Sequence, residues 1–247
     1  MTSDFSDKTA LVTGAASGIG EAISQLLAER GATIVAVDRS DRTASVCDAL
    51  PGDGHTFIRT DLTDATASVA IAAQLEATGT IPDILVNCAG IAVVKPAIDI
   101  SASEWQSVID VNLNAAFFLS QAIGGLMLTR GSGRIISIAS QAATVALEGH
   151  VAYCASKSAL LGMTRVLALE WASAGITVNT VSPTIVNTPM ATAEWSGDKG
   201  DRARAAIPVG RFAEPAEVAG LVAYLASEES AMITGQDVRI DGGYTIA

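Results

Sequence analysis

The stretch Thr13-Gly14-Ala15-Ala16-Ser17-Gly18-Ile19-Gly20 lies directly after a short β-branched run, Thr9–Val12, and opens a helix-prone stretch, Gly18–Glu29. Three glycines in this arrangement allow a sharp turn, a close approach of the backbone to a pyrophosphate and tight packing of the helix on the strand. The N-terminus of the helix would offer free N–H groups and the positive end of its dipole to phosphates. Because the turn joins a strand to a helix, it predicts a dinucleotide site at Gly14, Ser17, Gly18, Ile19 and Gly20, although an ordinary strand-to-helix turn has the same local form.

The residue after the second strand-like run indicates which dinucleotide this site would bind. Thr33–Val37 leads into Asp38, eighteen residues after Gly20. An acidic side chain at this place can accept hydrogen bonds from the adenosine ribose and would repel a 2′-phosphate. Asp38 therefore predicts NAD as the cofactor, and the neighbouring Arg39 could weaken the discrimination against NADP.

Strand-like and helix-like runs alternate along the chain, which predicts an α/β fold with a mostly parallel sheet and helices on both faces. Several strand-like runs are apolar at consecutive positions, as expected for strands that are covered on both sides. No repeat or linker interrupts the alternation, so residues 1–247 are expected to form a single domain. The predicted strands are Thr9–Val12, Thr33–Val37, Thr56–Ile58, Ile84–Val86, Ile135–Ile138, Thr177–Val181 and Asp237–Ile240, and the predicted helices are Gly18–Glu29, Ala65–Ala77, Ser103–Arg130, Val151–Ala174 and Pro215–Ser227.

Composition and charge exclude several classes of protein. Of the 247 residues, 49% are hydrophobic and 17% are charged, which is enough apolar surface to exclude a disordered chain. The formal net charge of −11 argues against a nucleic-acid or anionic-membrane partner, since either needs a basic surface. The three cysteines form neither a C-x-x-C pair nor a disulfide framework, which fits a reducing compartment. With no signal-peptide pattern at Met1–Asp4, and with polar residues inside the apolar run Val111–Thr129, we expect a cytoplasmic protein without a membrane span.

The stretch from Pro183 to Phe212 has the least regular pattern in the chain. It contains Pro189, Gly197, Gly200 and Pro208 and a charged patch, Asp198–Arg204. A segment of this length without a clear period is often a lid or a binding loop. We expect residues 183–212 to form a substrate loop, with a surface excursion as the alternative.

Two residues four positions apart suggest an acid/base pair. Tyr153 and Lys157 lie in a predicted helix and therefore share one face of it. A nearby ammonium favours the phenolate, so Lys157 is expected to lower the pKa of Tyr153 and allow it to exchange protons at moderate pH. Ser140 ends the preceding strand, where its hydroxyl could hold a substrate oxygen.

Taken together, these motifs resemble the short-chain dehydrogenase/reductase family over essentially the whole chain. The resemblance implies a Rossmann-type fold, with a doubly wound parallel sheet of seven strands, a nicotinamide cofactor and a homotetramer. The residues that match in order and spacing are Thr13-Gly14-x-x-x-Gly18-x-Gly20, Asn87-x-Ala89-Gly90, Asn112, Ser140, Tyr153-x-x-x-Lys157 and Asp241-Gly242-Gly243-Tyr244.

The resemblance also implies roles for individual residues. Tyr153 would be the general acid/base, Lys157 would bind the nicotinamide ribose and lower the Tyr153 pKa, Ser140 would position the reacting oxygen, and Asn112 would hold a water in a proton relay. The cofactor cleft would be lined by Asp61 and Leu62 beside the adenine, by Asn87, Ala89 and Gly90, and by Pro183, Val186 and Thr188 beside the nicotinamide carboxamide.

Two positions depart from the family pattern. Cys88 stands where a second asparagine is common, and Thr184 stands where glycine usually follows the proline after the sixth strand. The Pro183-Thr184 pair, together with Leu147, His150 and the Trp195 that follows Thr188-Pro189-Met190, resembles the xylulose-reductase branch and NAD-linked polyol dehydrogenases. The implied substrate pocket has apolar walls from Leu147 and Trp195 and hydrogen-bonding groups from Gln141 and His150, around Ser140 and Tyr153.

The sequence therefore predicts NAD-dependent oxidation of a short sugar alcohol, such as threitol or arabinitol, to a ketose. Reduction of a 3-oxoacyl thioester and oxidation of a steroid or another secondary alcohol are the alternatives within this family, because those enzymes share the catalytic motifs. His150 could instead be a capping residue, and Trp195 could be a core residue. We expect no metal, because the two histidines are far apart and no thiolates cluster. A nucleotide-binding regulator would have the glycine turn without Ser140, Tyr153 and Lys157.

Overall fold

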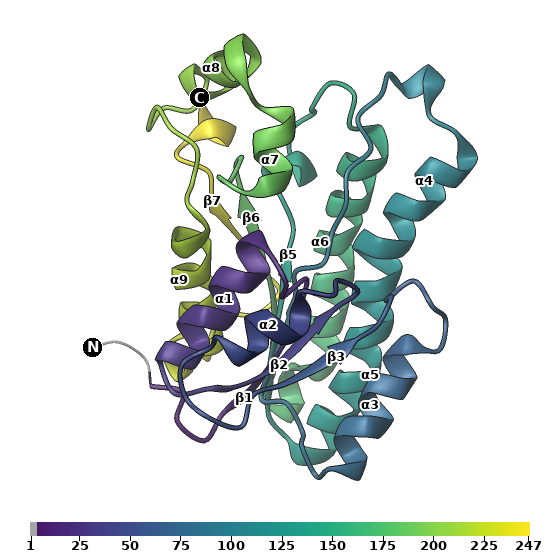
Figure 1. Cartoon of the computed structure of the whole chain (residues 1–247), viewed down its shortest axis with the longest axis vertical. Helices are drawn as coiled ribbons and strands as arrows, with labels where there is room; N and C mark the ends of the chain where they lie inside the picture. Colours follow the sequence, from purple (N-terminus) through teal and green to yellow (C-terminus); the bar gives the residue numbers. More distant parts are fainter. Residues whose placement is uncertain (1–3) are drawn as a thin grey trace.

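Seven parallel strands form one sheet in the computed structural model of the protein, which describes residues 4–247 (Figure 1). The strand order is β3-β2-β1-β4-β5-β6-β7. The chain order therefore reverses between β1 and β4, and such a reversal in a parallel sheet leaves a crevice at the carboxyl ends of the strands. The strands are β1 (Thr9–Thr13), β2 (Thr33–Asp38), β3 (Thr56–Arg59), β4 (Ile84–Asn87), β5 (Gly133–Ile138), β6 (Ile176–Pro183) and β7 (Asp237–Ile240).

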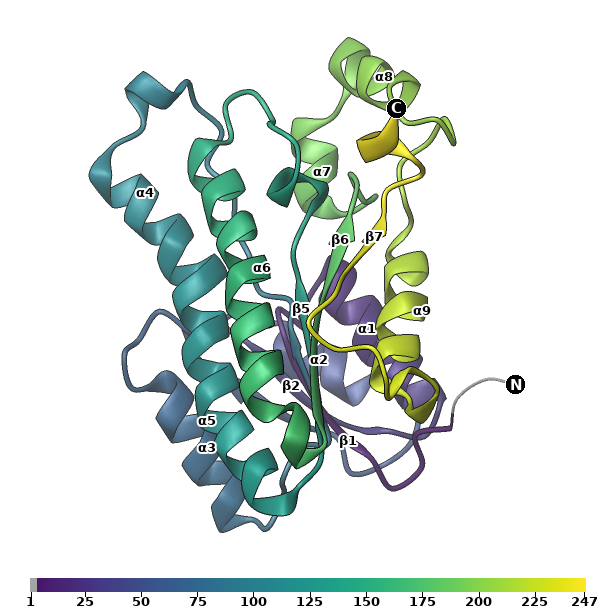
Figure 2. The same cartoon turned by 180° about the vertical axis from the view of Figure 1, so that it is seen from behind.

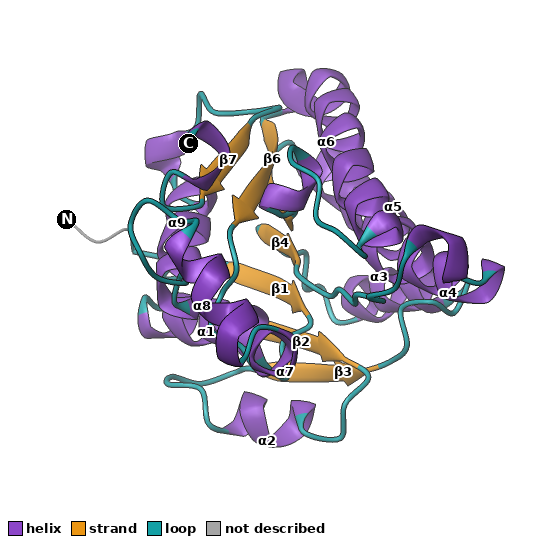
Figure 3. Ribbon diagram, turned by 90° about the horizontal axis from the view of Figure 1, so that it is seen from above, coloured by secondary structure: helices purple, strands orange, loops and turns teal. Residues whose placement is uncertain are grey.

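Helices cover both faces of the sheet (Figures 2 and 3). One face packs against α1 (Gly18–Glu29), α2 (Thr43–Asp48) and α9 (Pro215–Ala226). The other face packs against α3 (Ala67–Ala77), α5 (Ala115–Arg130) and α6 (Val151–Trp171), with α4 (Ala102–Ile109) leading into α5. Two short helices, α7 (Pro189–Glu194) and α8 (Gly197–Ala205), lie beyond the carboxyl ends of the strands (Figure 1).

The alternation of side chains along the strands explains why both layers of helices are needed. In β1, Ala10 and Val12 face the cluster under α1 and α9, whereas Leu11 faces the cluster under α3, α5 and α6. All three are fully buried. Successive side chains of a strand point to opposite faces, so a run that is apolar at every position must be covered on both sides.

The predicted Rossmann-type α/β fold is confirmed, and every predicted strand is present with ends that move by at most two residues. The helix at Gly18–Glu29 has the predicted bounds, and the capping box of Ser101 with Glu104 starts α4. The predicted helix Ser103–Arg130 is interrupted by one turn of π-helix at Asp110–Asn114. The irregular stretch 183–212 contains α7 and α8, which the sequence pattern did not predict.

The continuous helical run Ala102–Arg130 is long and apolar enough to cross a membrane by length and composition alone. Its apolar face is, however, part of the core, since Leu119, Ile123 and Met127 are fully buried against the sheet. This run is therefore a core helix of the fold, as predicted for Val111–Thr129.

Candidate active site

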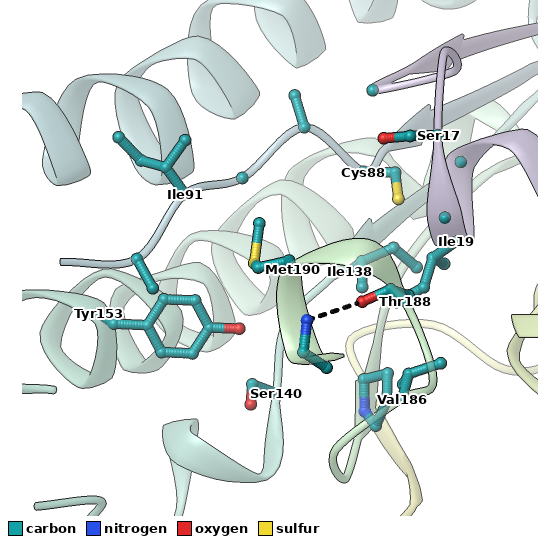
Figure 4. A pocket seen from close by; sticks show the side chains of 18 of the residues that line it. Ser17, Ile19, Cys88, Ile91, Ile138, Ser140, Tyr153, Val186, Thr188 and Met190 are labelled. Carbon is teal, nitrogen blue, oxygen red and sulfur yellow. Dashed lines mark hydrogen bonds between the residues drawn. The ribbon is translucent and has the colours of Figure 1, made fainter. Parts of the chain in front are cut away.

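A cleft of about 360 Å³ opens at the carboxyl ends of the strands, where the strand order reverses (Figure 4). Its walls come from the β1–α1 turn, the ends of β2 and β3, the loop after β4, the segments after β5 and β6, and the first turns of α6 and α7. The cleft runs from Asp38 and Asp61 at one end to Tyr153 and Trp195 at the other. Its length and its position in the sheet match the place where α/β proteins bind dinucleotides.

The glycine turn leaves no room for side chains where a phosphate would approach. Gly14 has φ +67°, and a Cβ there would lie 3.0 Å from the backbone of Ala89. A Cβ on Gly20 would lie 2.2 Å from the Gly14 carbonyl oxygen, so the first turn of α1 can pack only through glycine. The Ser17 backbone is extended at the N-cap of α1, and no side chain caps the free N–H groups of that helix. These groups provide the donors that a pyrophosphate needs, so the turn fits the predicted dinucleotide.

Asp38 and Asp61 provide carboxylates at the adenine end of the cleft. The Asp38 Oδ2 accepts a hydrogen bond from the Ala16 N–H at 3.1 Å, and its Oδ1 accepts one from the Ser40 N–H at 3.0 Å. The Asp38 carboxylate is thereby fixed at the lip of the glycine turn. Hydrogen bonds from Thr63 and the nearby Arg39 guanidinium lower the pKa of Asp61. Arg39 and Leu62 line the same end, as predicted.

The loop after β4 is held by a residue whose role the sequence did not reveal. The Thr13 hydroxyl accepts hydrogen bonds from the N–H groups of Cys88 and Ala89, at 2.9 and 3.1 Å. These contacts press Ala89 and Gly90 against the glycine turn, where both line the cleft. Burial raises the pKa of Cys88 to about 12, so its thiol is neutral. Threonine at the end of β1 was visible in the motif, but only the fold shows that it joins β1 to this loop.

The prediction that Asn87 lines the cofactor cleft is wrong. Asn87 has the same strand parity as Leu85, whose side chain lies in the cluster under α5. Its side chain is buried and donates to the hydroxyls of Ser120 on α5 and Ser137 on β5, at 2.9 and 3.3 Å. Asn87 therefore fixes the sheet beneath the cleft rather than a bound ligand.

Asn112 is placed by the π-helical turn and does not line the cleft. Its Oδ1 accepts from the Ile91 N–H at 2.8 Å, and its Nδ2 donates to the Ile91 carbonyl at 2.9 Å and to the Ser156 hydroxyl at 3.0 Å. The side chain thus ties the loop after β4 to α6. π-Helical turns within α-helices often occur at functional sites, because they redirect one side chain.

Tyr153, Lys157 and Ser140 converge at the nicotinamide end of the cleft, as predicted. Figure 4 shows the Tyr153 ring extending into the cleft, with Val186 and Thr188 across from it in that view. Ser140 lies beside Tyr153, where its side chain favours the phenolate, and its Oγ accepts a hydrogen bond from the Ala142 N–H at 3.1 Å. The Lys157 Nζ lies 5.6 Å from the centre of the Tyr153 ring and donates to the Ile138 carbonyl at 2.7 Å.

Burial dominates the titration of these groups. Burial raises the pKa of Tyr153 above its ordinary value of 10, and the nearby Ser140 side chain opposes this shift. Burial also lowers the pKa of the Lys157 amine to about 8. The predicted lowering of the Tyr153 pKa by Lys157 is therefore wrong here, because desolvation of the phenol sets the direction of the shift and Lys157 is not among the groups that lower this pKa.

The predicted substrate residues Gln141, Leu147, His150 and Trp195 all line the cleft beyond Tyr153. The Trp195 ring is stacked on the His150 ring, with the two planes 14° apart and their centres 6.3 Å apart. Gln141 and His150, the two polar residues of this set, are both buried. Their side chains therefore lie against the ligand space or against protein.

Both ring nitrogens of His150 already have partners. Nδ1 lies 2.8 Å from the Glu148 carbonyl, and Nε2 lies 3.0 Å from a carboxylate oxygen of Glu194 at the end of α7. That oxygen also accepts from the Lys199 amine at 2.9 Å. The His150 ring therefore lies between the Glu148 carbonyl and the Glu194 carboxylate, and one of its nitrogens contacts each. Glu194, which the sequence analysis did not single out, thus joins α7 to the start of α6.

Comparison with known proteins supports the interpretation of this cleft. The adh_short_C2 family model, described as Enoyl-(Acyl carrier protein) reductase, matches residues 14–245. The chain belongs to the short-chain dehydrogenase/reductase family. As a member of that family, it is an oxidoreductase that acts on alcohol groups with a nicotinamide cofactor.

Several members of the short-chain dehydrogenase/reductase family are similar to it over nearly their full length. D-threitol dehydrogenase of Mycolicibacterium smegmatis is 48% identical, over 97% of this chain and 93% of the relative. NAD-dependent glycerol dehydrogenase of Listeria innocua is 40% identical, over 98% of this chain and 96% of the relative. Proteins named 3-oxoacyl-[acyl-carrier-protein] reductase FabG also match, the one from Escherichia coli at 38%.

A solved member of the family has almost the same fold. The crystal structure of a gluconate 5-dehydrogenase from Burkholderia cenocepacia, in complex with NADP and tartrate, has a TM-score of 0.94. It is 31% identical, and the alignment covers 99% of this chain and 97% of that one. The fold and the oxidoreductase class are thereby established, whereas the choice between NAD and NADP differs among relatives.

Proposed function

We propose that this protein interconverts a short sugar alcohol, of the size of D-threitol or D-arabinitol, and the corresponding ketose. The composition of the cleft beyond Tyr153 carries this proposal. Leu147 and Trp195 offer apolar walls, and Gln141 adds a buried polar group beside Ser140 and Tyr153. Pockets that match hydroxyls with buried polar groups discriminate strongly in favour of polyhydroxylated substrates. The similarity to a D-threitol dehydrogenase over nearly the whole chain supports the same substrate class.

The proposed chemistry uses three side chains of the cleft. In the oxidative direction, a bound nicotinamide cofactor would supply the acceptor for the hydride of the substrate carbon. Tyr153 in its phenolate form would take the proton of the substrate hydroxyl at its phenolic oxygen and become the neutral phenol, and the Ser140 hydroxyl would hold the substrate oxygen. Lys157, four residues after Tyr153 on the same helix face, would bind the nicotinamide ribose. Asn112 would hold the loop at Ile91 and the Ser156 hydroxyl in place. The family resemblance also implies that Asn112 holds a water in a proton relay.

We propose NAD rather than NADP as the cofactor. The Asp38 carboxylate is fixed at the lip of the glycine turn, and each oxygen keeps a lone pair that a ribose hydroxyl could use. A 2′-phosphate at that place would meet a fixed negative charge. Arg39 could soften the repulsion, but its guanidinium is also drawn to Asp61. The relative from Listeria innocua is named as NAD-dependent, which agrees with this choice.

We further propose that the protein is a cytoplasmic homotetramer whose 183–212 segment covers the substrate. Support for assembly comes from large apolar side chains that are exposed on α5 and α6, namely Phe118, Val166 and Leu169. Support for the cover comes from α7, since Met190 and Glu194 line the cleft. Light scattering coupled to gel filtration tests the tetramer, and a monomer at micromolar concentration would refute it.

A substrate panel tests the proposed function. Tetritols, pentitols and hexitols are offered with NAD and with NADP, and NADH formation is followed at 340 nm; acetoacetyl thioester reduction with NADH and NADPH forms the rival arm. We expect the highest kcat/KM for a four- or five-carbon polyol with NAD, more than tenfold above the same polyol with NADP. No activity on any polyol, together with thioester reduction, would replace the proposal by a 3-oxoacyl reductase function.

A further inference from the structure

Two buried polar side-chain atoms, both on residues that line the cleft, have no hydrogen-bond partner among the described residues. They are the Gln141 Oε1 and the Thr184 Oγ1, on residues that are 2% and 7% exposed. Both residues line the cleft. Buried polar atoms without a partner are rare in native proteins, because each one loses its water without compensation. Two such atoms in one ligand cleft indicate a polar ligand group that bonds to them.

The parallel pairing of β5 and β6 brings these two residues to the same place. Ile138 pairs with Val181, and Ala139 still donates to the Val181 carbonyl at 2.8 Å. Gln141 and Thr184 each lie three residues beyond that pair, at neighbouring strand ends.

Their backbones are held by the protein itself. The Thr184 N–H donates to the Ile240 carbonyl at 3.1 Å, and Gln141 starts a 3₁₀ turn that is capped by the Ser140 hydroxyl. The two residues are therefore held at the strand ends beside Ser140, which the proposed function places at the reacting oxygen.

The chemistry of the two atoms selects the ligand. An amide oxygen only accepts, and a threonine hydroxyl can donate. A hydroxyl group can satisfy both at once, by donating to Gln141 Oε1 and accepting from Thr184 Oγ1. A ketone, an ether or an acyl chain has no hydrogen to give and would leave Gln141 Oε1 without a partner.

We propose that Gln141 and Thr184 form a subsite for a hydroxyl on the carbon next to the one oxidised, and that Thr184 determines specificity for vicinal diols. This inference rests on the proposed polyol function and narrows it, because it names the part of the polyol that the cleft recognises. The family pattern usually has glycine at this position, which has no hydroxyl to offer. Thr184 is thus the feature that separates this cleft from one that accepts simple secondary alcohols.

A pair of substrates that differ by one hydroxyl tests the subsite. Each stereoisomer of butane-2,3-diol is compared with butan-2-ol, with NAD, in the wild type and in Thr184→Val and Thr184→Ser. Valine keeps the shape of threonine without its hydroxyl. We expect Thr184→Val to reduce the diol-to-butan-2-ol ratio of kcat/KM by about 10- to 100-fold, and Thr184→Ser to keep it within about threefold of the wild type.

Thr164→Val provides the matched control. The Thr164 hydroxyl on α6 is also buried without a partner, but it does not line the cleft. This variant should leave the ratio unchanged. An equal loss of kcat/KM on both alcohols in Thr184→Val would overturn the inference and assign Thr184 to packing. A rise confined to the KM for NAD would also overturn it and would assign Thr184 to binding the carboxamide of the cofactor.

The failure of this inference can be told apart from the failure of the proposed function. If the wild type oxidises no polyol, the proposed function fails, and the subsite is then measured by binding. Calorimetric titration of the protein–NADH complex with the diol and with butan-2-ol gives the preference directly. The inference requires the wild type to prefer the diol and Thr184→Val to lose that preference; equal binding of both alcohols by the wild type contradicts it.

Discussion

Lys157 provides a quantitative test of the electrostatics of the cleft. Its amine is buried, with only 4% of the residue exposed, and burial lowers its pKa from 10.5 to about 8. Each pKa unit corresponds to about 1.4 kcal/mol, so carrying the charged amine in the folded state costs about 3 kcal/mol near neutral pH. Methionine has a similar length and no charge. Allowing about 1 kcal/mol for the lost hydrogen bond to the Ile138 carbonyl, Lys157→Met should raise the free energy of unfolding at pH 7 by about 2 kcal/mol.

The stabilisation should depend on pH in a defined direction. Between pH 8 and 10.5 the unfolded wild-type chain binds more protons at this lysine than the folded protein does, so the stability contributed by this site rises with pH. The advantage of Lys157→Met is therefore full below pH 8 and is lost by pH 10.5. Other titrating groups are common to both proteins and cancel in the difference.

Urea unfolding followed by circular dichroism measures this difference. Cofactor-free wild type and Lys157→Met are compared at pH 7 and pH 10 at one protein concentration, with Lys8→Met as a control on an amine whose side chain is about half exposed. We expect the free energy of unfolding of Lys157→Met to exceed that of the wild type by about 2 kcal/mol at pH 7, and this difference to fall close to zero at pH 10. We expect no such pH dependence for the control. A gap that is absent at pH 7, or that does not vary with pH, would refute the description of Lys157 as a buried and disfavoured cation.

Three further predictions concern the cleft. Ser140→Ala removes a hydroxyl that lowers the pKa of Tyr153, so the pH at which oxidation reaches half its maximal kcat/KM should move upward, and an unmoved profile would contradict this. Asp38→Ala should reduce the NAD-to-NADP ratio of kcat/KM by at least about tenfold in steady-state assays, since it removes the charge that repels a 2′-phosphate, whereas an unchanged ratio would remove Asp38 from cofactor selection. Glu194→Ala breaks the bond to His150 that joins α7 to α6 and should raise the substrate KM about tenfold with little change in kcat; a fall in kcat alone would count against this positioning role.

The parts of the fold that follow from local sequence were predicted correctly. The glycine turn and helix Gly18–Glu29 depend on neighbouring residues, so their bounds agree with the structure. Tyr153 and Lys157 share a face because of helix geometry alone. The proximity of Ser140 to Tyr153 followed from the order of strands that the family resemblance implied.

The remaining features depend on contacts between distant segments and could not be predicted. The direction of Asn87 depends on the strand parity that β4 acquires within the sheet. The π-helical turn that directs Asn112 toward Ile91 is not visible in a helical pattern. The bond between His150 and Glu194 forms only once α7, which is too short and polar to show a period, packs beside α6.

The raised pKa of Tyr153 is a similar case. Sequence proximity suggested that an ammonium four residues away would lower it. In the folded protein, burial desolvates the phenol and the amine together, so the charge that was expected to act is itself weakened.

The account depends most directly on Tyr153 as the group that takes the proton from the substrate. Tyr153→Phe removes only the phenolic oxygen, and Tyr224→Phe, on the partly exposed face of α9, is the matched control. NADH formation from the best polyol gives kcat, and NADH fluorescence titration gives the Kd of the cofactor. We predict a loss of kcat of about 100- to 10,000-fold in Tyr153→Phe, with the Kd for NADH within about threefold of the wild type and the control unchanged. Turnover by Tyr153→Phe at close to the wild-type rate would contradict the account.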